Sequence, residues 1–331
     1  MRYYLCETIP ETGQKYRAGK KRNDIEETMK TLGFGDITVN AAPEVGFGAY
    51  RRFRGYFDWL EEGDTLIVQA PFMTSTIIMR RLLKSLEKRG VSTYVVIHEL
   101  DDFIENCAGL GKECSGVFVN NEKAAFELIK QKLDIAKIVP FDLYDYYIPE
   151  GISGSCGEFS LKGPIVIAGT LSREEAGYVY RLPDNCHFRL YGKGFEGEVT
   201  ENVAFGGEYL PNDLPFMLKG SFGLVWTGTT PQTCLGLAGE VLKTYNPMQM
   251  SLYLSSGLPV IVWSESAAAD FVIQKGCGFT ISSLAEIGFR LNSMSEKTYS
   301  KMKKSAEDIG IPMRDGCYGR SAIMKMCDMM P

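Results

Sequence analysis

The sequence has few of the residues and motifs that metalloenzymes and hydrolases of its size use for catalysis. Its two histidines, His98 and His187, exclude a histidine-rich metal site and disfavour a Ser-His-Asp triad. Nine cysteines, an odd number, form no C-x-x-C pair, so neither a disulfide framework nor a zinc site is predicted. No Asp-x-Asp clamp follows a predicted strand, and we expect no metal and no cofactor.

Two nucleotide-binding motifs are also absent. The residues after the first predicted strand, 6–13, contain no G-x-G-x-x-G, and the Walker A pattern occurs nowhere. These absences disfavour a nicotinamide oxidoreductase and P-loop phosphoryl transfer.

No apolar run approaches the roughly 20 residues that span a bilayer, and the N-terminus lacks a secretory pattern. We therefore expect a cytoplasmic protein, which would meet a lipid-linked substrate by peripheral contact with the membrane. A net charge of −5 disfavours nucleic acid as a partner. One basic cluster fits either a solvated helix start or an anion or membrane-surface role: Lys15, Arg17, Lys20, Lys21 and Arg22.

Apolar strands alternate with helical periodicity through most of the chain, which predicts doubly wound parallel sheets of the α/β class. In the first half the predicted strands are Tyr3–Leu5, Ile37–Val39, Thr65–Gln69, Ser92–Ile97 and Gly116–Val119, and the helices Asn23–Leu32, Gly48–Leu60, Ser75–Lys88 and Glu122–Leu133. In the second half the strands are Pro164–Ala168, His187–Tyr191, Phe222–Trp226, Pro259–Trp263 and Phe279–Ile281, and the helices Glu174–Tyr180, Asn212–Leu218, Pro247–Ser255, Ala267–Gln274 and Gly316–Met329.

Glycines and serines in residues 148–163 are typical of a linker between the two halves. We expect a Rossmann-like domain in residues 1–150, a second in 151–315, and a C-terminal helix in 316–331 that crosses back to the first domain or stays on the second. Ligands of open α/β sheets bind at the carboxyl ends of the strands, so a site is expected there in each half.

The second half contains two segments suited to a diphosphate. Asn246 is a suitable N-cap and Pro247 a suitable first helical residue, and the start of such a helix attracts anions. Upstream, Gly169-Thr170-Leu171-Ser172-Arg173 follows a predicted strand, and a guanidinium binds phosphate bidentately. The alternatives are an ordinary capped helix and a surface turn with an exposed arginine.

In the first half, His98, Glu99 and Asp101 follow a predicted strand, where acid and base groups of α/β enzymes are found. One of them could take a proton from an acceptor hydroxyl. The alternative is a helix start whose acidic residues complement the helix dipole.

These residues, with several further motifs, resemble the bacterial galactofuranosyltransferase-like and glucosyltransferase 3-like family. The similar segments are Gly223-Leu224-Val225-Trp226-x-Gly228, Gly236-x-x-Gly239-Glu240-x-Leu242-Lys243, Asn246-Pro247, Ser251 to Leu254, Gly257 to Trp263, Ala269-Asp270-Phe271, Gly278 to Leu284, Ala18-Gly19-x-Lys21-x-Asn23-Asp24, Ile97-His98 and Leu143-x-Asp145-Tyr146.

The resemblance implies a GT-B fold, in which two Rossmann-like domains face each other across a cleft. It implies metal-independent transfer of a hexose (galactofuranose, glucose or galactose) from a UDP-sugar to a glycan or lipid-linked acceptor, in the synthesis of a cell-surface polysaccharide or glycoprotein. We also expect a homo-oligomer. The implied UDP contacts are Tyr16, Arg17, Arg173, Phe205, Tyr209, Asn246, Pro247, Met248, Gln249, Met250 and Ser251.

Three positions depart from the family pattern. Gln249 stands where a lysine is frequent, Thr227 where an aspartate is frequent, and Tyr245 where a second asparagine precedes Asn-Pro. A glutamine can bond to phosphate but carries no charge. The alternative function is therefore a non-catalytic UDP-sugar-binding partner of another transferase.

Overall fold

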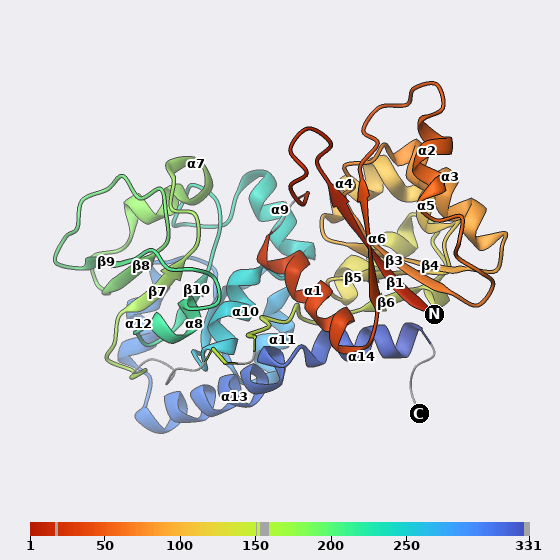
Figure 1. Cartoon of the computed structure of the whole chain (residues 1–331). Helices are drawn as coiled ribbons and strands as arrows, with labels where there is room; N and C mark the ends of the chain where they lie inside the picture. The colour runs from red at the N-terminus through yellow and green to blue at the C-terminus, as the bar shows by residue number, and fades with distance from the viewer. Residues whose placement is uncertain (17–18, 150, 153–158, 328–331) are drawn as a thin grey trace. The chain divides into compact units, whose positions relative to one another are not determined.

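The computed structural model describes all residues except 17–18, 150, 153–158 and 328–331. The chain forms two compact units (Figure 1). Unit 1 comprises Met1–Leu143 and the chain from Tyr318 onward, and unit 2 comprises Tyr144–Cys317.

Unit 1 contains a six-stranded sheet in the order β2-β1-β3-β4-β5-β6, with every neighbouring pair parallel. Its central strands are buried on both faces, as their apolar runs predict. The strand order reverses between β1 and β3. The strands are β1 (Arg2–Thr8), β2 (Gly35–Asn40), β3 (Thr65–Ala70), β4 (Ser92–Ile97), β5 (Gly116–Val119) and β6 (Ile138–Pro140).

Helices cover both faces of this sheet. The crossover through α1 runs in the opposite direction along the sheet from the later crossovers, so right-handed connections place α1 on the face opposite to α3 and α6. One hydrophobic core joins β1, β3, β4 and β5 to α2, α3 and α6. The helices are α1 (Lys20–Thr31), α2 (Ala49–Gly55), α3 (Thr76–Glu87), α4 (Leu100–Asp102), the π-turn η1 (Phe103–Cys107), α5 (Ala108–Gly111), α6 (Glu122–Lys130), the 3₁₀ turn η2 (Ile135–Lys137) and α14 (Cys317–Met326).

Unit 2 contains a second parallel six-stranded sheet, in the order β12-β11-β10-β7-β8-β9. This is the order of a Rossmann fold, and it reverses between β7 and β10. The strands are β7 (Ile165–Ala168), β8 (Phe188–Tyr191), β9 (Val203–Gly207), β10 (Gly223–Val225), β11 (Val260–Trp263) and β12 (Gly278–Ile281).

Helix α10 (Met248–Ser255) is packed between the sheet of unit 2 and α13 (Glu296–Arg314). Two glycines allow this close packing. A Cβ at Gly310 would lie 1.9 Å from the Leu254 carbonyl oxygen, and one at Gly223 would lie 2.1 Å from the ring of Tyr253. The other helices are α7 (Arg173–Ala176), the 3₁₀ turn η3 (Gly177–Arg181), α8 (Leu214–Met217), α9 (Gly236–Thr244), α11 (Ala268–Lys275) and α12 (Glu286–Asn292).

Every strand predicted from the sequence overlaps an observed strand, which confirms the α/β class. Strands β6 and β9 and helices α9, α12 and α13 were not predicted. The predicted helix Gly316–Met329 corresponds to α14 over the residues that the structure describes, whereas much of the predicted linker lies outside them. No helix in the described part of the chain is long and apolar enough to cross a membrane.

Candidate active site

The reversal of strand order marks one position in each sheet where a ligand is expected. Loops leave the sheet in opposite directions there, and the carboxyl ends of the two strands stay uncovered between them. In unit 2 the position lies at the ends of β7 and β10, followed by Gly169 and Trp226. In unit 1 it lies at the ends of β1 and β3.

Three glycines occupy the carboxyl ends of β7, β8 and β9. Gly169, Gly192 and Gly207 have φ angles of 144°, 125° and 107°, which disfavour any residue with a Cβ. The Gly192 amide donates to the Gly207 carbonyl (3.0 Å), and the Gly169 amide donates to the carbonyl of Tyr191 (3.0 Å). The turns after three adjacent strands are therefore packed backbone to backbone, and the Gly169 turn has little freedom to move.

We expect Gly192→Ala to destabilise unit 2 by about 3 kcal/mol, because the new methyl would lie 2.0 Å from the Gly169 carbonyl oxygen. The control is Gly236→Ala, which also has positive φ (75°) but no atom within 4 Å of the added Cβ. This control substitution should lower the free energy of unfolding by only about 1 kcal/mol. Urea unfolding measures both, and equal losses would refute the packing argument.

Two side chains of α10 attach its first turns to the end of β7. The Gln249 side-chain amide donates to the Ala168 carbonyl oxygen (2.6 Å), and the buried Tyr253 hydroxyl accepts from the Ala168 amide (2.8 Å). The Ser251 hydroxyl donates a further hydrogen bond to the carbonyl oxygen of Tyr144 (2.6 Å). Gln249 also touches the Gly169 turn, since a Cβ on Gly169 would lie 2.8 Å from its amide nitrogen. The start of α10 is thus fixed beside the Gly169 turn.

The predicted cap of this helix is shifted by one residue. Pro247, with extended φ and ψ of −73° and 153°, is the N-cap, and Met248 is the first helical residue. Asn246 precedes the cap and is buried, so the prediction that it caps the helix is wrong. The N-cap makes no side-chain hydrogen bond to the helix, so no side chain at this position neutralises the positive end of the dipole.

Arg173 is the first residue of α7 and heads a stack of aromatic rings. Its guanidinium lies 4.1 Å from the centre of the Tyr180 ring, which stacks on Phe195, which in turn stacks on Phe205. The Tyr180 hydroxyl donates to the Leu171 carbonyl (2.8 Å), in the turn that follows Gly169. An ion pair of 3.8 Å joins Arg173 to Glu196, and both side chains are largely exposed. Such a pair is weak in water, and a ligand phosphate could replace Glu196.

Tyr209, on the same unit, packs against a different ring. Its ring centre is 6.3 Å from that of Tyr191, at the end of β8. Phe205 and Tyr209 both keep more than a third of their surface exposed. A nucleobase could stack on either ring.

In unit 1, a chain of buried polar groups lies under the carboxyl ends of β3 and β4. His98 is 2% exposed, and its Nε2 lies 2.6 Å from the Gln69 side-chain oxygen. The Gln69 side-chain amide donates to Glu26 (3.1 Å), which also forms an ion pair with Lys15. The Lys21 ammonium donates to the His98 carbonyl (3.1 Å). His98 is therefore held in place by its neighbours and is poorly placed to touch a substrate.

Glu99 and Asp101, in contrast, are exposed. Glu99 directly follows the fixed backbone of His98 at the end of β4, and Asp101 lies in the short helix α4. The sequence analysis missed a further carboxylate at this edge, Glu7. It is buried and accepts bonds from the amides of Met73 (3.0 Å) and Thr74 (2.8 Å), which joins the ends of β1 and β3.

The basic cluster predicted near the N-terminus turns inward. Arg22 is buried and donates to the carbonyls of Gln69 (3.1 Å) and Pro71 (2.5 Å). Lys20 pairs with Asp24 (2.6 Å), and burial lowers the pKa of the Lys20 ammonium. Tyr16 lies 5.8 Å beneath the Arg22 guanidinium, while Arg17 lies outside the described residues. The interpretation as a solvated helix start is therefore wrong for Lys20 and Arg22.

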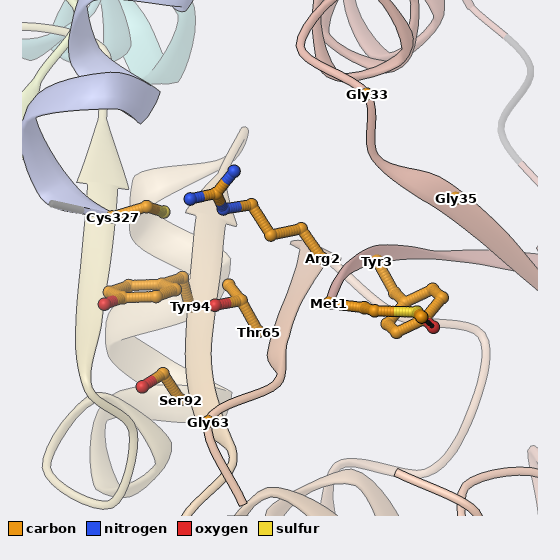
Figure 2. A pocket seen from close by; sticks show the side chains of 10 residues that line it. All are labelled: Met1, Arg2, Tyr3, Gly33, Gly35, Gly63, Thr65, Ser92, Tyr94 and Cys327. Carbon is orange, nitrogen blue, oxygen red and sulfur yellow. Dashed lines mark hydrogen bonds between the residues drawn. The ribbon is translucent and has the colours of Figure 1, made fainter. Parts of the chain in front are cut away.

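A cavity of about 750 Å³ lies at the opposite, amino-terminal edge of the unit 1 sheet (Figure 2). The Arg2 guanidinium points towards Cys327 across it. Its position is opposite to the edge where α/β sheets bind ligands. The lining residues are Met1, Arg2, Tyr3, Gly33, Gly35, Gly63, Thr65, Ser92, Tyr94 and Cys327.

Among the described residues, no group of three or more His, Cys, Asp or Glu side chains is arranged to hold a metal.

Comparison with known proteins identifies the family of this chain. The model of the glucosyltransferase 3-like N-terminal domain matches residues 2–140, and that of the C-terminal domain matches residues 165–326. The beta-1,6-galactofuranosyltransferase WbbI of Escherichia coli (strain K12) is 28% identical over 81% of both chains. Glucosyltransferase 3 of Streptococcus gordonii is 21% identical over 92% of both. Among solved structures, Anabaena Alr3699/HepE in complex with UDP covers 100% of both chains with a TM-score of 0.61 at 11% identity.

The two Rossmann-like units have the topology of the GT-B fold. The chain belongs to the glucosyltransferase 3-like family, as its sequence motifs predicted, and is a hexosyltransferase.

Proposed function

We propose that the enzyme transfers a hexose from a UDP-sugar to a glycan acceptor, with the donor diphosphate at the start of α10. The observation that carries this proposal is the attachment of α10 to β7 through Gln249 and Tyr253, which holds a positive helix end beside the Gly169 turn. The solved complex of HepE with UDP, a protein of the same fold, supports a uridine diphosphate as the nucleotide.

In this proposal unit 2 holds the donor and unit 1 supplies the acceptor side. UDP leaves with negative charge on its β-phosphate, and the helix dipole, the backbone amides and Arg173 stabilise that charge, so the reaction needs no metal. The uracil stacks on Phe205 or Tyr209. Tyr16, Arg17 and the remaining residues from Asn246 to Ser251 stay predicted contacts or supports of the nucleotide.

The general base would be a carboxylate of unit 1. We favour Glu99, because it is exposed and follows a fixed backbone, with Asp101 as the alternative. His98 would act as a positioning residue, since its buried ring fixes the end of β4 through Gln69.

The sugar is proposed to be galactofuranose, glucose or galactose. The relatives are a galactofuranosyltransferase and a glucosyltransferase by name, which supports the first two. A glycan or lipid-linked acceptor in a cell-surface polysaccharide or glycoprotein pathway, a cytoplasmic location and a homo-oligomeric state complete the proposal.

A second candidate is a UDP-sugar-binding partner without activity of its own. The side-chain amide of Gln249 is hydrogen-bonded to the Ala168 carbonyl oxygen, and no lysine supplies a positive charge at that position. Donor turnover distinguishes the two candidates, because only the first predicts release of UDP.

We expect UDP at about one hundred times its Kd to stabilise unit 2 by about 2.7 kcal/mol and to raise the Tm of that unit by roughly 5–10 °C. ADP and GDP, which carry the same diphosphate, are the controls and should shift Tm less. Thermal shift measures binding, and release of UDP from UDP-galactofuranose, UDP-glucose and UDP-galactose then measures turnover. If UDP leaves Tm unchanged, the proposed donor is wrong.

A further inference from the structure

An exposed patch on unit 1 combines an apolar tip with two exposed arginines. The segment between β2 and α2 carries Val45 and Phe47, and the Phe47 side chain is completely exposed. Arg51 and Arg52 follow within α2, the helix labelled in Figure 1, and both are exposed. We call Val45, Phe47, Arg51, Arg52 and Ile77 the α2 patch.

The fold holds this tip in an exposed position. Gly48, with φ 75°, is the N-cap of α2, and the Arg52 guanidinium donates to the Phe47 carbonyl (3.4 Å). Tyr50 donates to the Arg81 carbonyl on α3 (3.4 Å). Ile77, also on α3, adds a further exposed apolar side chain. A fully exposed phenylalanine gains free energy only when something covers it.

The charges of the α2 patch indicate what covers it. The first turn of α2 contains no acidic residue that could neutralise the neighbouring arginines. Among the residues that the structure describes, Arg51 and Arg52 form no ion pair, whereas Arg54 in the last turn pairs with Asp58 (3.1 Å). Within the described part of the chain no carboxylate neutralises these two arginines, and their charge suits an external anionic surface.

We propose that the α2 patch docks unit 1 on an anionic lipid surface. Phe47 and Val45 would insert among the lipid headgroups, and Arg51 and Arg52 would bind the phosphates around them. The basic cluster near the N-terminus cannot serve in this way to the same extent, because Arg22 and Lys20 are engaged within unit 1.

Docking here would also turn the carboxyl edge of unit 1 towards the lipid. The segment starts where β2 ends. The Ala42 carbonyl accepts a hydrogen bond from the Ser75 amide (2.8 Å), and the Ala42 amide donates to the Thr74 hydroxyl (3.1 Å), both in the turn after β3. It therefore lies at the same sheet edge as Glu99. That a lipid-linked acceptor is thereby brought to the base rests on the proposed function, whereas lipid binding does not.

The test is sedimentation of the full chain with vesicles of phosphatidylcholine alone and of an equal mixture with phosphatidylglycerol. The wild type should sediment with the mixed vesicles, and salt should weaken its binding. Arg51→Gln/Arg52→Gln should lower the partition coefficient about 30-fold, and Phe47→Ser about tenfold. The matched control is Phe289→Ser/Arg290→Gln on α12, which removes another exposed phenylalanine and arginine and should bind like the wild type.

Three results would overturn the inference. The wild type could stay in the supernatant with the mixed vesicles, or the control could lose as much binding as the α2 patch variants. Alternatively, the wild type could be a dimer that Phe47→Ser makes monomeric, in which case a second copy covers the patch. The UDP thermal shift of each variant is measured in parallel. If vesicles bind but UDP does not, the proposed function fails and this inference stands.

Discussion

Glu99→Gln is expected to lower the rate of sugar transfer by about 10²–10⁴-fold, the range for loss of a general base. The amide keeps the size of the side chain but cannot take a proton from the acceptor hydroxyl. Glu99 is exposed and far in sequence from the donor residues of unit 2, so KM for the donor should stay near its wild-type value. Sugar transfer to a glycan acceptor, monitored through the release of UDP, gives both the rate and KM for the donor.

Asp101→Asn is the matched control, because Asp101 is an exposed carboxylate two residues further along the chain. It should transfer sugar at close to the wild-type rate. A large loss in Asp101→Asn with normal activity in Glu99→Gln would assign the base to Asp101, and normal activity in both would remove this edge of unit 1 from the chemistry.

Arg173→Ala should reduce transfer by about 10²–10³-fold, as loss of one preorganised group that stabilises developing charge does. Gln249 supplies no charge at the start of α10, so the guanidinium is the side-chain cation that the proposal assigns to the departing diphosphate. Stacking on Tyr180 limits the positions of Arg173, and Tyr180 is tied to the Gly169 turn through Leu171. Rates with saturating donor measure the effect on kcat.

Arg173→Lys separates charge from geometry, since an ammonium keeps the charge but cannot bind phosphate in a bidentate way. We expect it to recover only part of the lost rate. Arg181→Ala removes another exposed arginine of the same unit and should leave the rate unchanged. Equal activity of Arg173→Ala and Arg181→Ala would exclude Arg173 from the mechanism.

Parallel strands were the most predictable part of this fold. Runs such as Leu258 to Trp263 are apolar on both faces, and this pattern depends on burial by layers above and below the sheet rather than on distant contacts. Strand β9 was missed because it contains Gly206 and Gly207, and glycine argues against a strand unless a close backbone approach requires it.

Helix α13 was missed for a related reason. It contains Gly310 and Pro312, which disfavour a helix by local propensity, and it is rich in lysine. Its position depends on packing against α10, where only a glycine fits beside the Leu254 carbonyl. Sequence periodicity carries little information about such a tertiary contact.

The site was predicted in outline but not in detail. The capping rule selected Asn246, yet the extended conformation of Pro247 starts the helix one residue later. A glutamine at position 249 looked like a lost cation, and the structure shows a bond that attaches the helix to β7. The role of Glu7 could not be seen because its partners, the amides of Met73 and Thr74, are 66 and 67 residues away.

Unit 1 is built from two separate stretches of the chain, so it cannot be completed until the end of translation. Its sheet is complete by Pro140, but the residues from Tyr318 onward emerge from the ribosome only after all of unit 2. Until then Gly116 on β5 lacks the Met326 side chain that lies against it, and part of the apolar surface of unit 1 stays uncovered. The main core of unit 1 ends at Ile138 and can form early in translation, but unit 1 is completed only after unit 2 has been made.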